Sequence, residues 1–215
     1  MYKYIIDVAL GGSSEQFVRV LSETAREFDP AFGAVAADYK NATNAPHFTL
    51  KYWFSADEEQ IAGLIDSIAL LVDRTAAFSV SFDGIVHPNF EDSLDPNKHV
   101  VHVEPKRGDD GQAFVLELMK LLSSRDWVEW CDFDNRGEGP VPHSTIAIVK
   151  SADMDAAAAR GHAFEGLMER LRATAWDRLG PCSGVVESLR VRRKKDEEGA
   201  STTTFFERRF QTMID

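Results

Sequence analysis

A twelve-residue frame occurs twice in this chain, and it constrains the fold more than any other feature of the sequence. Residues 46–57 and residues 142–153 both read P-H-x-T-[LI], then four variable positions, then S-A-D. The second copy begins 142 − 46 = 96 positions after the first. Self-similarity at fixed offsets indicates a duplicated structural unit, here with two copies rather than a solenoid array.

The histidine and threonine of each copy stand two residues apart on a segment that reads as a β-strand. Side chains of a strand alternate between its two faces, so His47 shares a face with Thr49, and His143 shares one with Thr145. Two such strands related by a pseudo-twofold axis bring two imidazoles and two hydroxyls around one point. The repeat therefore predicts a phosphate-sized site that contains an acid and a base.

A structural explanation covers only part of the repeat. A lone histidine in a strand is usually structural, and one H-x-T is expected by chance in many proteins. The S-A-D element is explained by helix N-capping, because Ser and Asp are preferred N-cap residues. A duplicated fold gives no similar reason to keep His and Thr on an open face. We therefore interpret both H-x-T pairs as functional.

Hydrophobic periodicity predicts the same order of elements in both halves. The first half has strands at residues 2–10, 47–54 and 78–86, with helices opened by two capping boxes, Ser13 with Gln16 and Ser55 with Glu58. The second half has strands at 99–104, 143–149, 184–193 and 202–211, with helices at 110–123 and from 151 onward. Residues 78–86 and 99–104 are expected to form a long hairpin.

These elements predict an α+β fold. We expect residues 1–215 to form a single two-lobed domain of duplicated βαβαβ units. Two antiparallel-rich sheets face a central cleft, with the helices outside.

Alternation also predicts which residues face the cleft. The core face of the first motif strand is expected to carry Phe48, Leu50, Tyr52 and Phe54. The core face of the second is expected to carry Ser144, Ile146 and Ile148, which leaves Ala147 and Val149 on the open face.

Four residues are candidates for substrate binding. Lys51 and Trp53 share the expected open face of the first motif strand. Lys51 adds positive charge there or is a solvated rim residue, and Trp53 stacks a base or packs at the sheet edge. Arg190 and Arg192 are expected to point outward from the strand at 184–193, toward the cleft or toward solvent.

The charge balance disfavours a long nucleic acid as partner. With 24 basic and 35 acidic residues, the net charge is −11 and the pI is about 5.0. Gripping a long nucleic acid needs many phosphate contacts, whereas a small phosphorylated ligand needs only a local basic pocket.

Other sequence features favour a soluble, metal-independent protein. The two cysteines are interpreted as reduced, buried thiols of a cytoplasmic protein. Asp7 interrupts the first apolar stretch, and no segment reaches the roughly 20 apolar residues of a membrane span. The sequence contains no recognised metal-binding motif. His99 and His102 fall on opposite faces of their strand, so the two rings cannot bind one metal ion. We expect a monomer with no metal, no cofactor and no membrane contact.

The chain resembles the two-histidine (2H) phosphoesterase superfamily, which contains 2′-5′ RNA ligase-like proteins and cyclic nucleotide phosphodiesterases. The mark of that family is two H-x-[TS]-h motifs, in which h is a hydrophobic residue. They stand here at residues 47–50 and 143–146. The resemblance implies a bilobal fold over nearly the whole chain. It also implies that His47 and His143 are catalytic and that Thr49 and Thr145 contact the scissile phosphate. Segments 89–97 and 124–141 look longer and more acidic than in a minimal member.

The expected function is metal-independent hydrolysis of a cyclic (2′,3′-type) or 2′-linked phosphodiester of a nucleotide or RNA end. One histidine acts as base and the other as acid, because imidazole titrates near working pH. Three alternatives stay open. They are a 2′-5′ RNA ligase, a phosphodiesterase acting on a small metabolite such as a cyclic ADP-ribose phosphate, and a non-catalytic module that binds phosphate or RNA.

Overall fold

The computed structural model describes residues 1–32, 46–82, 86–89, 98–131, 143–179, 182–194 and 202–212. Its strands are β1 (Tyr2–Leu10), β2 (His47–Ala56), β3 (Ser79–Phe82), β4 (Val86–Asn89), β5 (Lys98–Val103), β6 (Lys106–Arg107), β7 (Ser144–Lys150), β8 (Cys182–Lys194) and β9 (Thr202–Arg209). Its helices are α1 (Gly12–Phe28), α3 (Glu58–Asp73), α4 (Asp109–Ser123), α5 (Ser151–Ala159), α6 (Phe164–Ala173) and the π-helical turn η3 (Thr174–Leu179). No described helix is both long and apolar enough to cross a membrane.

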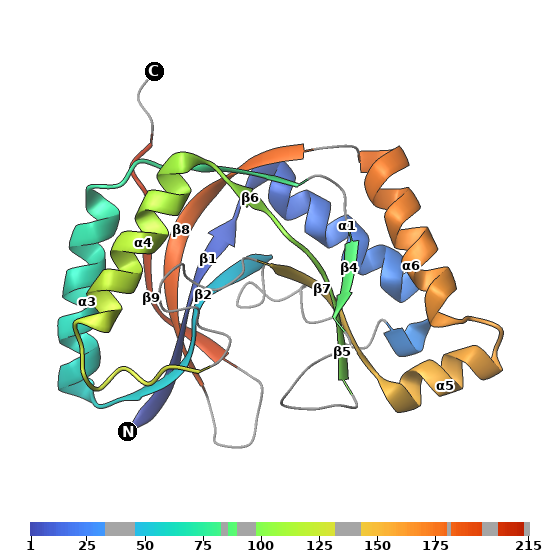
Figure 1. Cartoon of the computed structure of the whole chain (residues 1–215), viewed down its shortest axis with the longest axis horizontal. Coiled ribbons are helices and arrows are strands. Elements are labelled where there is room, and N and C mark those ends of the chain that lie inside the picture. Colours follow the sequence, from blue (N-terminus) through green and yellow to red (C-terminus); the bar gives the residue numbers. More distant parts are fainter. Residues whose placement is uncertain are drawn as a thin grey trace.

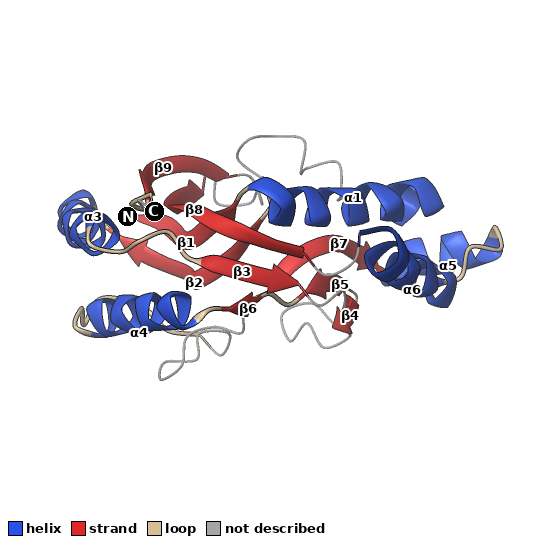
Figure 2. Cartoon of the chain, turned by 90° about the horizontal axis from the view of Figure 1, so that it is seen from above, coloured by secondary structure: helices blue, strands red, loops and turns tan. Residues whose placement is uncertain are grey.

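The strands form two sheets. The first has the order β2-β1-β8-β3-β6, with β9 also pairing to β8, and the second has the order β4-β5-β7. All pairings between the named strands are antiparallel. Figures 1 and 2 show the helices outside the strands, with α3 and α4 at one end and α1, α5 and α6 at the other. The predicted α+β fold of two antiparallel sheets with outer helices is confirmed.

The two motif strands are the places where the sheets meet. β2 ends the first sheet and β7 ends the second, and these two strands contact each other. We call the first sheet with α3 and α4 the first lobe, and the second sheet with α1, α5 and α6 the second lobe. The repeated segments therefore lie at the junction of the lobes.

The lobes do not correspond to the two halves of the chain. The C-terminal strands β8 and β9 complete the first sheet beside β1, and α1 from the N-terminal half packs against β7 and α6 of the second lobe. A chain that crosses between lobes in this way ties them together at several points.

One strand pairing differs from the sequence prediction. β3 ends at Phe82 and pairs with β8 and β6, and β4 is the strand that forms a hairpin with β5. The chain thus passes from the first sheet to the second between Phe82 and Val86. Alternation does not reveal this change, because the apolar pattern continues at residues 85 and 86.

The predicted start of α1 is also wrong. Gly11 is the N-cap of α1 and no side chain caps the helix. The hydroxyl of Ser13 instead donates a hydrogen bond to the carbonyl of Ser183 at the start of β8. Ser14 donates to the carbonyl of Gly11 over 2.7 Å. The first turn of α1 is therefore anchored to the neighbouring strand rather than closed by a capping box.

The S-A-D elements do not play the same role in the two copies. β2 continues to Ala56, and the capping box of α3 is formed by Asp57 and Gln60 rather than by Ser55 and Glu58. In the second copy, Ser151 is already the first residue of α5, and no side chain caps that helix. Because β7 is shorter than β2, the same three residues fall at different points of the strand-to-helix turn.

The helix expected from residue 151 onward is two helices. α5 ends before Gly161, which has a φ of +83°. The N–H groups of Gly161 and His162 donate to the carbonyls of Ala158 and Ala157, which closes the end of α5. Glycine adopts this left-handed conformation without steric penalty, so the helix stops here and α6 begins at Phe164.

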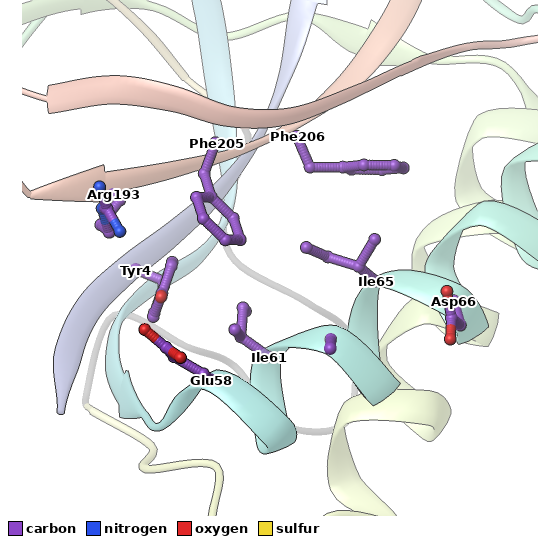
Figure 3. A pocket seen from close by; sticks show the side chains of 9 residues that line it. Tyr4, Glu58, Ile61, Ile65, Asp66, Arg193, Phe205 and Phe206 are labelled. Carbon is purple, nitrogen blue, oxygen red and sulfur yellow. The ribbon is translucent and has the colours of Figure 1, made fainter.

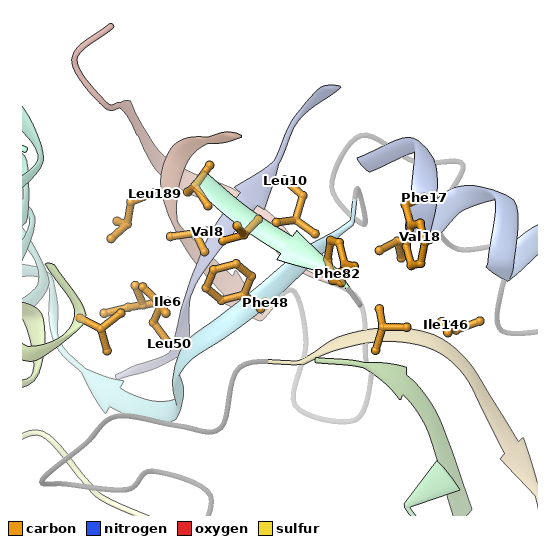
Figure 4. Packing of buried hydrophobic residues seen from close by; sticks show 14 of the residues in the cluster. Ile6, Val8, Leu10, Phe17, Val18, Phe48, Leu50, Phe82, Ile146 and Leu189 are labelled. Atoms are coloured by element: carbon orange, nitrogen blue, oxygen red, sulfur yellow. The ribbon is translucent and has the colours of Figure 1, made fainter. Parts of the chain in front are cut away.

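Both lobes share one hydrophobic cluster. Figure 4 shows side chains of the first sheet, among them Ile6, Val8 and Phe48, in the same cluster as Phe17 of α1 and Ile146 of β7. All five are at most 2% exposed. Fully burying a side chain of this size contributes about 1.5–3 kcal/mol. The motif strands are held against this cluster by their apolar residues.

A buried carboxylate fastens α1 to the turn between α5 and α6. Asp29, directly after α1, accepts hydrogen bonds from Arg160 Nη2 (2.6 Å) and His162 Nδ1 (2.8 Å) and has no exposed side-chain area. The hydrogen bonds from Arg160 and then from His162 hold the pKa of Asp29 well below its ordinary value, against the opposing effect of burial.

Replacing Asp29 by Asn should lower the stability of the fold. We expect the Tm of Asp29→Asn to fall by about 3–6 °C at pH 7, because two charge-assisted hydrogen bonds are weakened. The pKa of Asp29 is lower in the folded state, so its contribution exists above the ordinary Asp pKa and is lost as pH falls through the folded value. Thermal unfolding at several pH values checks this, since the Tm difference should shrink on acidification. A difference that grows toward low pH contradicts it.

Candidate functional site

Both motif strands contain a β-bulge at the fourth position of the motif. In the first lobe, Thr49 pairs with Asp7 of β1 and Lys51 pairs with Ile6, so Leu50 is an extra residue. In the second lobe, Thr145 pairs with His102 of β5 and Ala147 pairs with Val101, so Ile146 is an extra residue. A bulge bends the strand and re-aims side chains. The duplication therefore includes a bulge at the hydrophobic motif position.

The bulges leave the motif residues facing as predicted, and the bulge in β7 reverses the residues after it. Histidine and threonine are partly exposed in both copies, and the residues between and after them, Phe48, Leu50, Ser144 and Ile146, are buried. Beyond the bulge the alternation shifts by one. Ala147 and Val149, predicted on the open face, are fully buried, and Ile148, predicted in the core, is partly exposed.

The bulge in β7 is supported by α1. The hydroxyl of Ser22 donates a hydrogen bond of 2.8 Å to the carbonyl of Ile146, and Ser22 is buried. A bulged residue leaves the regular ladder, so its backbone groups need other partners. The helix that crosses from the N-terminal half thus stabilises the backbone beside Thr145.

A buried ion cluster lies beside the first motif. Asp7 of β1 accepts a hydrogen bond of 2.7 Å from Arg190 Nε and forms an ion pair with Arg192 Nε. Both arginines come from β8, and all three residues are at most 5% exposed. Arg192 also donates to Thr202 of β9 over 3.3 Å. Both arginines were expected to point outward, and they lie on the motif face of the sheet, buried rather than in solvent.

Arg192 reaches the first motif histidine. Its Nη2 lies 3.0 Å from Nε2 of His47. A guanidinium has no acceptor, so Arg192 donates and Nε2 accepts in this contact, which puts the proton of the neutral ring on Nδ1. A permanent positive charge therefore stands next to one motif imidazole.

The Asp7 carboxylate remains ionised in this cluster. Burial, the largest single influence, raises the pKa of Asp7, but the opposing effects of the nearby basic side chains, His47, Arg192 and Arg190, outweigh burial. The pKa of Asp7 is therefore below its ordinary value. Because Asp7 stays ionised, its ion pairs with Arg190 and Arg192 and its hydrogen bond with Arg190 persist at this point of the sheet.

A different group occupies the corresponding place beside the second motif. The ring of His102 lies 5.1 Å from the ring of His143, measured between centroids, and His102 Nε2 is 3.3 Å from Glu104 Oε1. His102 is 8% exposed, between the core residues Val101 and Val103. Among the described contacts, the second motif histidine has an imidazole nearby, and that imidazole in turn contacts a carboxylate.

Lys51 does not lie on the motif face, contrary to the prediction. It is fully buried, its Nζ donates to the carbonyl of Tyr52 over 2.9 Å, and the same atom stands over the rings of Phe54 and Trp130 at 5.6 and 5.3 Å. The bulge at Leu50 turns Lys51 inward, as the bulge at Ile146 turns Ala147 inward in the second copy. Lys51 is thus not a solvated rim lysine.

Three tryptophans near the first motif strand have different surroundings. Trp53 is partly buried in β2. Trp127 packs against Phe54 with ring centroids 6.2 Å apart, and Trp130 lies over Lys51. Cys131 is exposed and Cys182 is partly buried, so the expectation of two buried thiols is wrong, although neither forms a disulfide. Most of the two segments that look long and acidic in the sequence, residues 90–97 and 132–141, lies outside the described residues.

A pocket of about 430 Å³ lies away from the motifs. Figure 3 shows it between α3 and the strands β1 and β9, lined by Tyr4, Ile61, Arg193 and Phe205 among others. Tyr4 and Arg193 point to the opposite face of the sheet from Asp7 and Arg192, because they differ from them by an odd number of positions. This pocket is therefore separated from the motif residues by the sheet.

Sequence reasoning did not assign a functional role to Asp7 or to His102. The available signal for Asp7 was a lone carboxylate in an otherwise apolar strand, which needs a buried partner. Within the described ranges, no three His, Cys, Asp or Glu side chains gather in a way that suits a metal ion.

The chain was compared with known proteins. The family model of the 2′-5′ RNA ligase superfamily matches residues 14–191. E. coli LigT in complex with 3′-AMP has a TM-score of 0.55 at 16% identity, over 97% of this chain and 98% of that one. TT0787 of Thermus thermophilus has a TM-score of 0.50 at 15% identity, over 99% and 100%. At such identities the structural likeness shows the fold alone. A search of curated proteins found no match.

The ion cluster predicts a large difference between two Asp→Asn variants. Asp7→Asn leaves two buried arginines without their anion and should destabilise the fold by about 3–5 kcal/mol. Asp73→Asn is the matched control, because Asp73 also pairs with an arginine, Arg208, but both side chains are 43–50% exposed. An exposed pair contributes little. Urea unfolding checks both variants. Equal urea midpoints would show that the buried cluster contributes no more to the free energy of unfolding than the exposed pair does.

Proposed function

This chain belongs to the 2′-5′ RNA ligase superfamily, and from that premise we propose that it is a metal-independent phosphodiesterase. The proposed reaction is hydrolysis of a cyclic (2′,3′-type) or 2′-linked phosphodiester of a nucleotide or an RNA end. We propose that the protein acts as a cytoplasmic monomer in which residues 1–215 form one two-lobed domain.

One observation carries the proposal. Two H-x-T strands, each bulged at the same motif position, end the two sheets and contact each other. Each strand keeps its histidine and threonine partly exposed while the neighbouring motif residues are buried. A fold that needed these residues only for packing would bury them. The arrangement supports a shared site for two imidazoles and two hydroxyls at the junction of the lobes.

The chemistry needs one base and one acid. In the proposed mechanism one motif imidazole takes a proton from water, whose oxygen then attacks phosphorus. The other imidazole gives a proton to the oxygen that leaves, so the pair holds the same number of protons after hydrolysis. Histidine suits both roles, since its ordinary pKa is about 6.5. Thr49 and Thr145 donate hydrogen bonds to the non-bridging oxygens, where negative charge grows.

Arg192 is the proposed phosphate ligand among the basic residues. Its guanidinium is fixed by Asp7 and stands 3.0 Å from the imidazole of His47, so an anion that contacts that ring also meets an arginine N–H. Arginine binds phosphate oxygens strongly because its donors are planar and always charged. Arg190 is proposed to support Arg192 through their common partner Asp7.

The proposed substrate is small. The net charge of −11 disfavours many contacts with a long nucleic acid, and Arg190 and Arg192, the basic groups seen beside the first motif in the described part of the chain, lie around Asp7. Solved complexes of LigT contain NADP+, ATP and 3′-AMP. A nucleotide ligand is consistent with both points. Assays with 2′,3′-cyclic nucleotides, 2′-5′ dinucleotides and a cyclic ADP-ribose phosphate distinguish the substrate classes, and joining of RNA ends identifies ligation.

Hydrolysis should require both motif histidines and no metal. We expect His47→Ala and His143→Ala each to lower kcat by about 10²–10⁴-fold with an unchanged fold, because each removes a proton-transfer group. Steady-state rates with the best substrate from the assays above check this, and His162→Ala, outside the motifs, serves as control. Full activity in either motif variant sinks the mechanism. Loss of activity in EDTA that added metal restores sinks the metal-independent part.

Replacing Arg192 should separate binding from proton transfer. We expect Arg192→Lys to raise KM about tenfold or more, because a lysine keeps the charge but lacks the planar donors that face both Asp7 and the phosphate. The kinetic parameters and the Kd of inorganic phosphate check this result. An unchanged KM together with unchanged phosphate affinity would show that Arg192 does not contact the substrate.

A further inference from the structure

The pocket behind the first sheet is a second place where polar groups and aromatic rings converge. It has a volume of about 430 Å³ and lies between α3 and the strands β1 and β9. Tyr4 and Ile61, which line it, are each 1% exposed, whereas Phe205 is 42% exposed. The pocket thus reaches from buried side chains to the surface. A cavity of this size with apolar walls fits a small organic molecule.

A β-bulge in β9 shapes the aromatic wall of the pocket. In β9, Phe206 pairs with Val191 of β8, and the next pair joins Thr204 to Arg192. Phe205 is therefore an extra residue. Two consecutive side chains of a regular strand point to opposite faces, but a bulge re-aims them. Both Phe205 and Phe206 line the pocket as a result, across from α3.

Aromatic side chains hold the guanidinium of Arg193 at one end of this pocket. Its central carbon lies 4.7 Å from the ring centroid of Tyr2 and 5.3 Å from that of Phe205. Arg193 also donates a hydrogen bond to the hydroxyl of Tyr4. Cation–π contacts engage the faces of a guanidinium and leave its in-plane N–H groups for acceptors. Within the described residues, no carboxylate forms an ion pair with Arg193.

Tyr4 adds a second donor at the same end of the pocket. Burial raises the pKa of the Tyr4 hydroxyl above its ordinary value, against the opposing effect of Arg193. The hydroxyl is therefore protonated at neutral pH. A hydroxyl oxygen that accepts from Arg193 keeps its own proton to donate. Arg193 and Tyr4 thus offer N–H and O–H donors together, beside walls that are mainly apolar.

Two carboxylates of α3 also line the pocket. Glu58 is an electrostatic neighbour of Tyr4, and Asp66 lies at the other end of the pocket from Arg193 (Figure 3). Both carboxylates are exposed, whereas Arg193 is partly buried. The attraction between two charges weakens as water surrounds them, by about fourfold between a protein surface and bulk water. The partly buried arginine therefore has more weight in the choice of ligand than the exposed carboxylates.

We propose that this pocket binds a small aromatic acid, whose ring packs between α3 and the two phenylalanines and whose carboxylate meets Arg193 and Tyr4. The planar fork of guanidinium donors matches the two oxygens of a carboxylate. Ile61 and Ile65 on one side and the phenylalanine rings on the other bury the ring of the ligand. The sheet separates this pocket from the motif residues, so the proposal does not depend on the phosphodiesterase activity.

Three probes with the same ring and the same chain test the charge of the ligand. They are indolepropionate, the neutral indolepropionamide and the cationic indolepropylamine. Titration of the full chain, followed by two-dimensional NMR of the backbone amides, gives the Kd of each probe and shows which residues it contacts. We expect indolepropionate to bind about tenfold more tightly than the amide, and the amine to bind most weakly. The largest shifts should fall on α3 and β9.

Variants assign the binding to this pocket. Arg193→Gln should weaken indolepropionate about tenfold and leave the amide within about twofold, because glutamine donates hydrogen bonds but carries no charge. Glu58→Gln should tighten indolepropionate about two- to threefold, since it removes a nearby negative charge. Arg209→Gln, on β9 outside the pocket, and Arg192→Lys, on the motif face, are controls that should leave the Kd within about twofold.

The order of the probes decides the proposal. An amine that binds as tightly as indolepropionate overturns it, as does a Kd for indolepropionate above about 5 mM. An indolepropionate Kd that changes in Arg192→Lys but not in Arg193→Gln also overturns it, because the probe then occupies the motif face. If Arg193→Gln does not fold, Glu58→Gln decides, since Glu58 is exposed in the first turn of α3. An unchanged or weaker affinity in that variant contradicts the proposal.

Discussion

The carboxylate of Asp7, buried between the guanidinium groups of Arg190 and Arg192, is the interaction on which the arrangement of the first lobe depends. It joins β1 to β8 across 183 positions of the chain. Burying three charged groups is favourable only when they neutralise one another and keep good hydrogen-bond geometry. The cluster therefore fixes the register of β1 against β8. Through Arg192 it also fixes the surroundings of His47.

The duplicated bulges explain how the motif residues keep the same orientation in two sheets of different size. β2 ends a sheet of six strands and β7 ends one of three, yet both carry the extra residue at the hydrophobic motif position. A bulge lets two consecutive residues turn toward the core, so the histidine and threonine before it keep their face while the strand bends. The core contacts of Leu50 and Ile146 hold each bulge in place.

The support around the two motifs is not duplicated. His47 has an arginine held by a buried carboxylate, and His143 has a second imidazole held by a half-exposed carboxylate. Two catalytic imidazoles of one reaction need opposite protonation states, and identical surroundings would give them the same tendency to bind a proton. Different neighbouring groups give the two imidazoles different tendencies to bind a proton.

The sequence alone determined the order of most strands and helices, the α+β fold class and the shared face of each histidine–threonine pair, because alternation and helical periodicity are local properties of the chain. The tertiary structure decided the rest. A bulge depends on the partner strand, so the sequence pattern predicted the wrong face for Lys51, Ala147 and Val149. Strand pairing joins residues far apart in the chain, so the pattern also did not reveal that β3 belongs to the first sheet. Asp7 and His102 reach the motifs only through strand pairing. Local patterns carry no information about which distant strand supplies the neighbour, and the neighbour sets the charge around each imidazole.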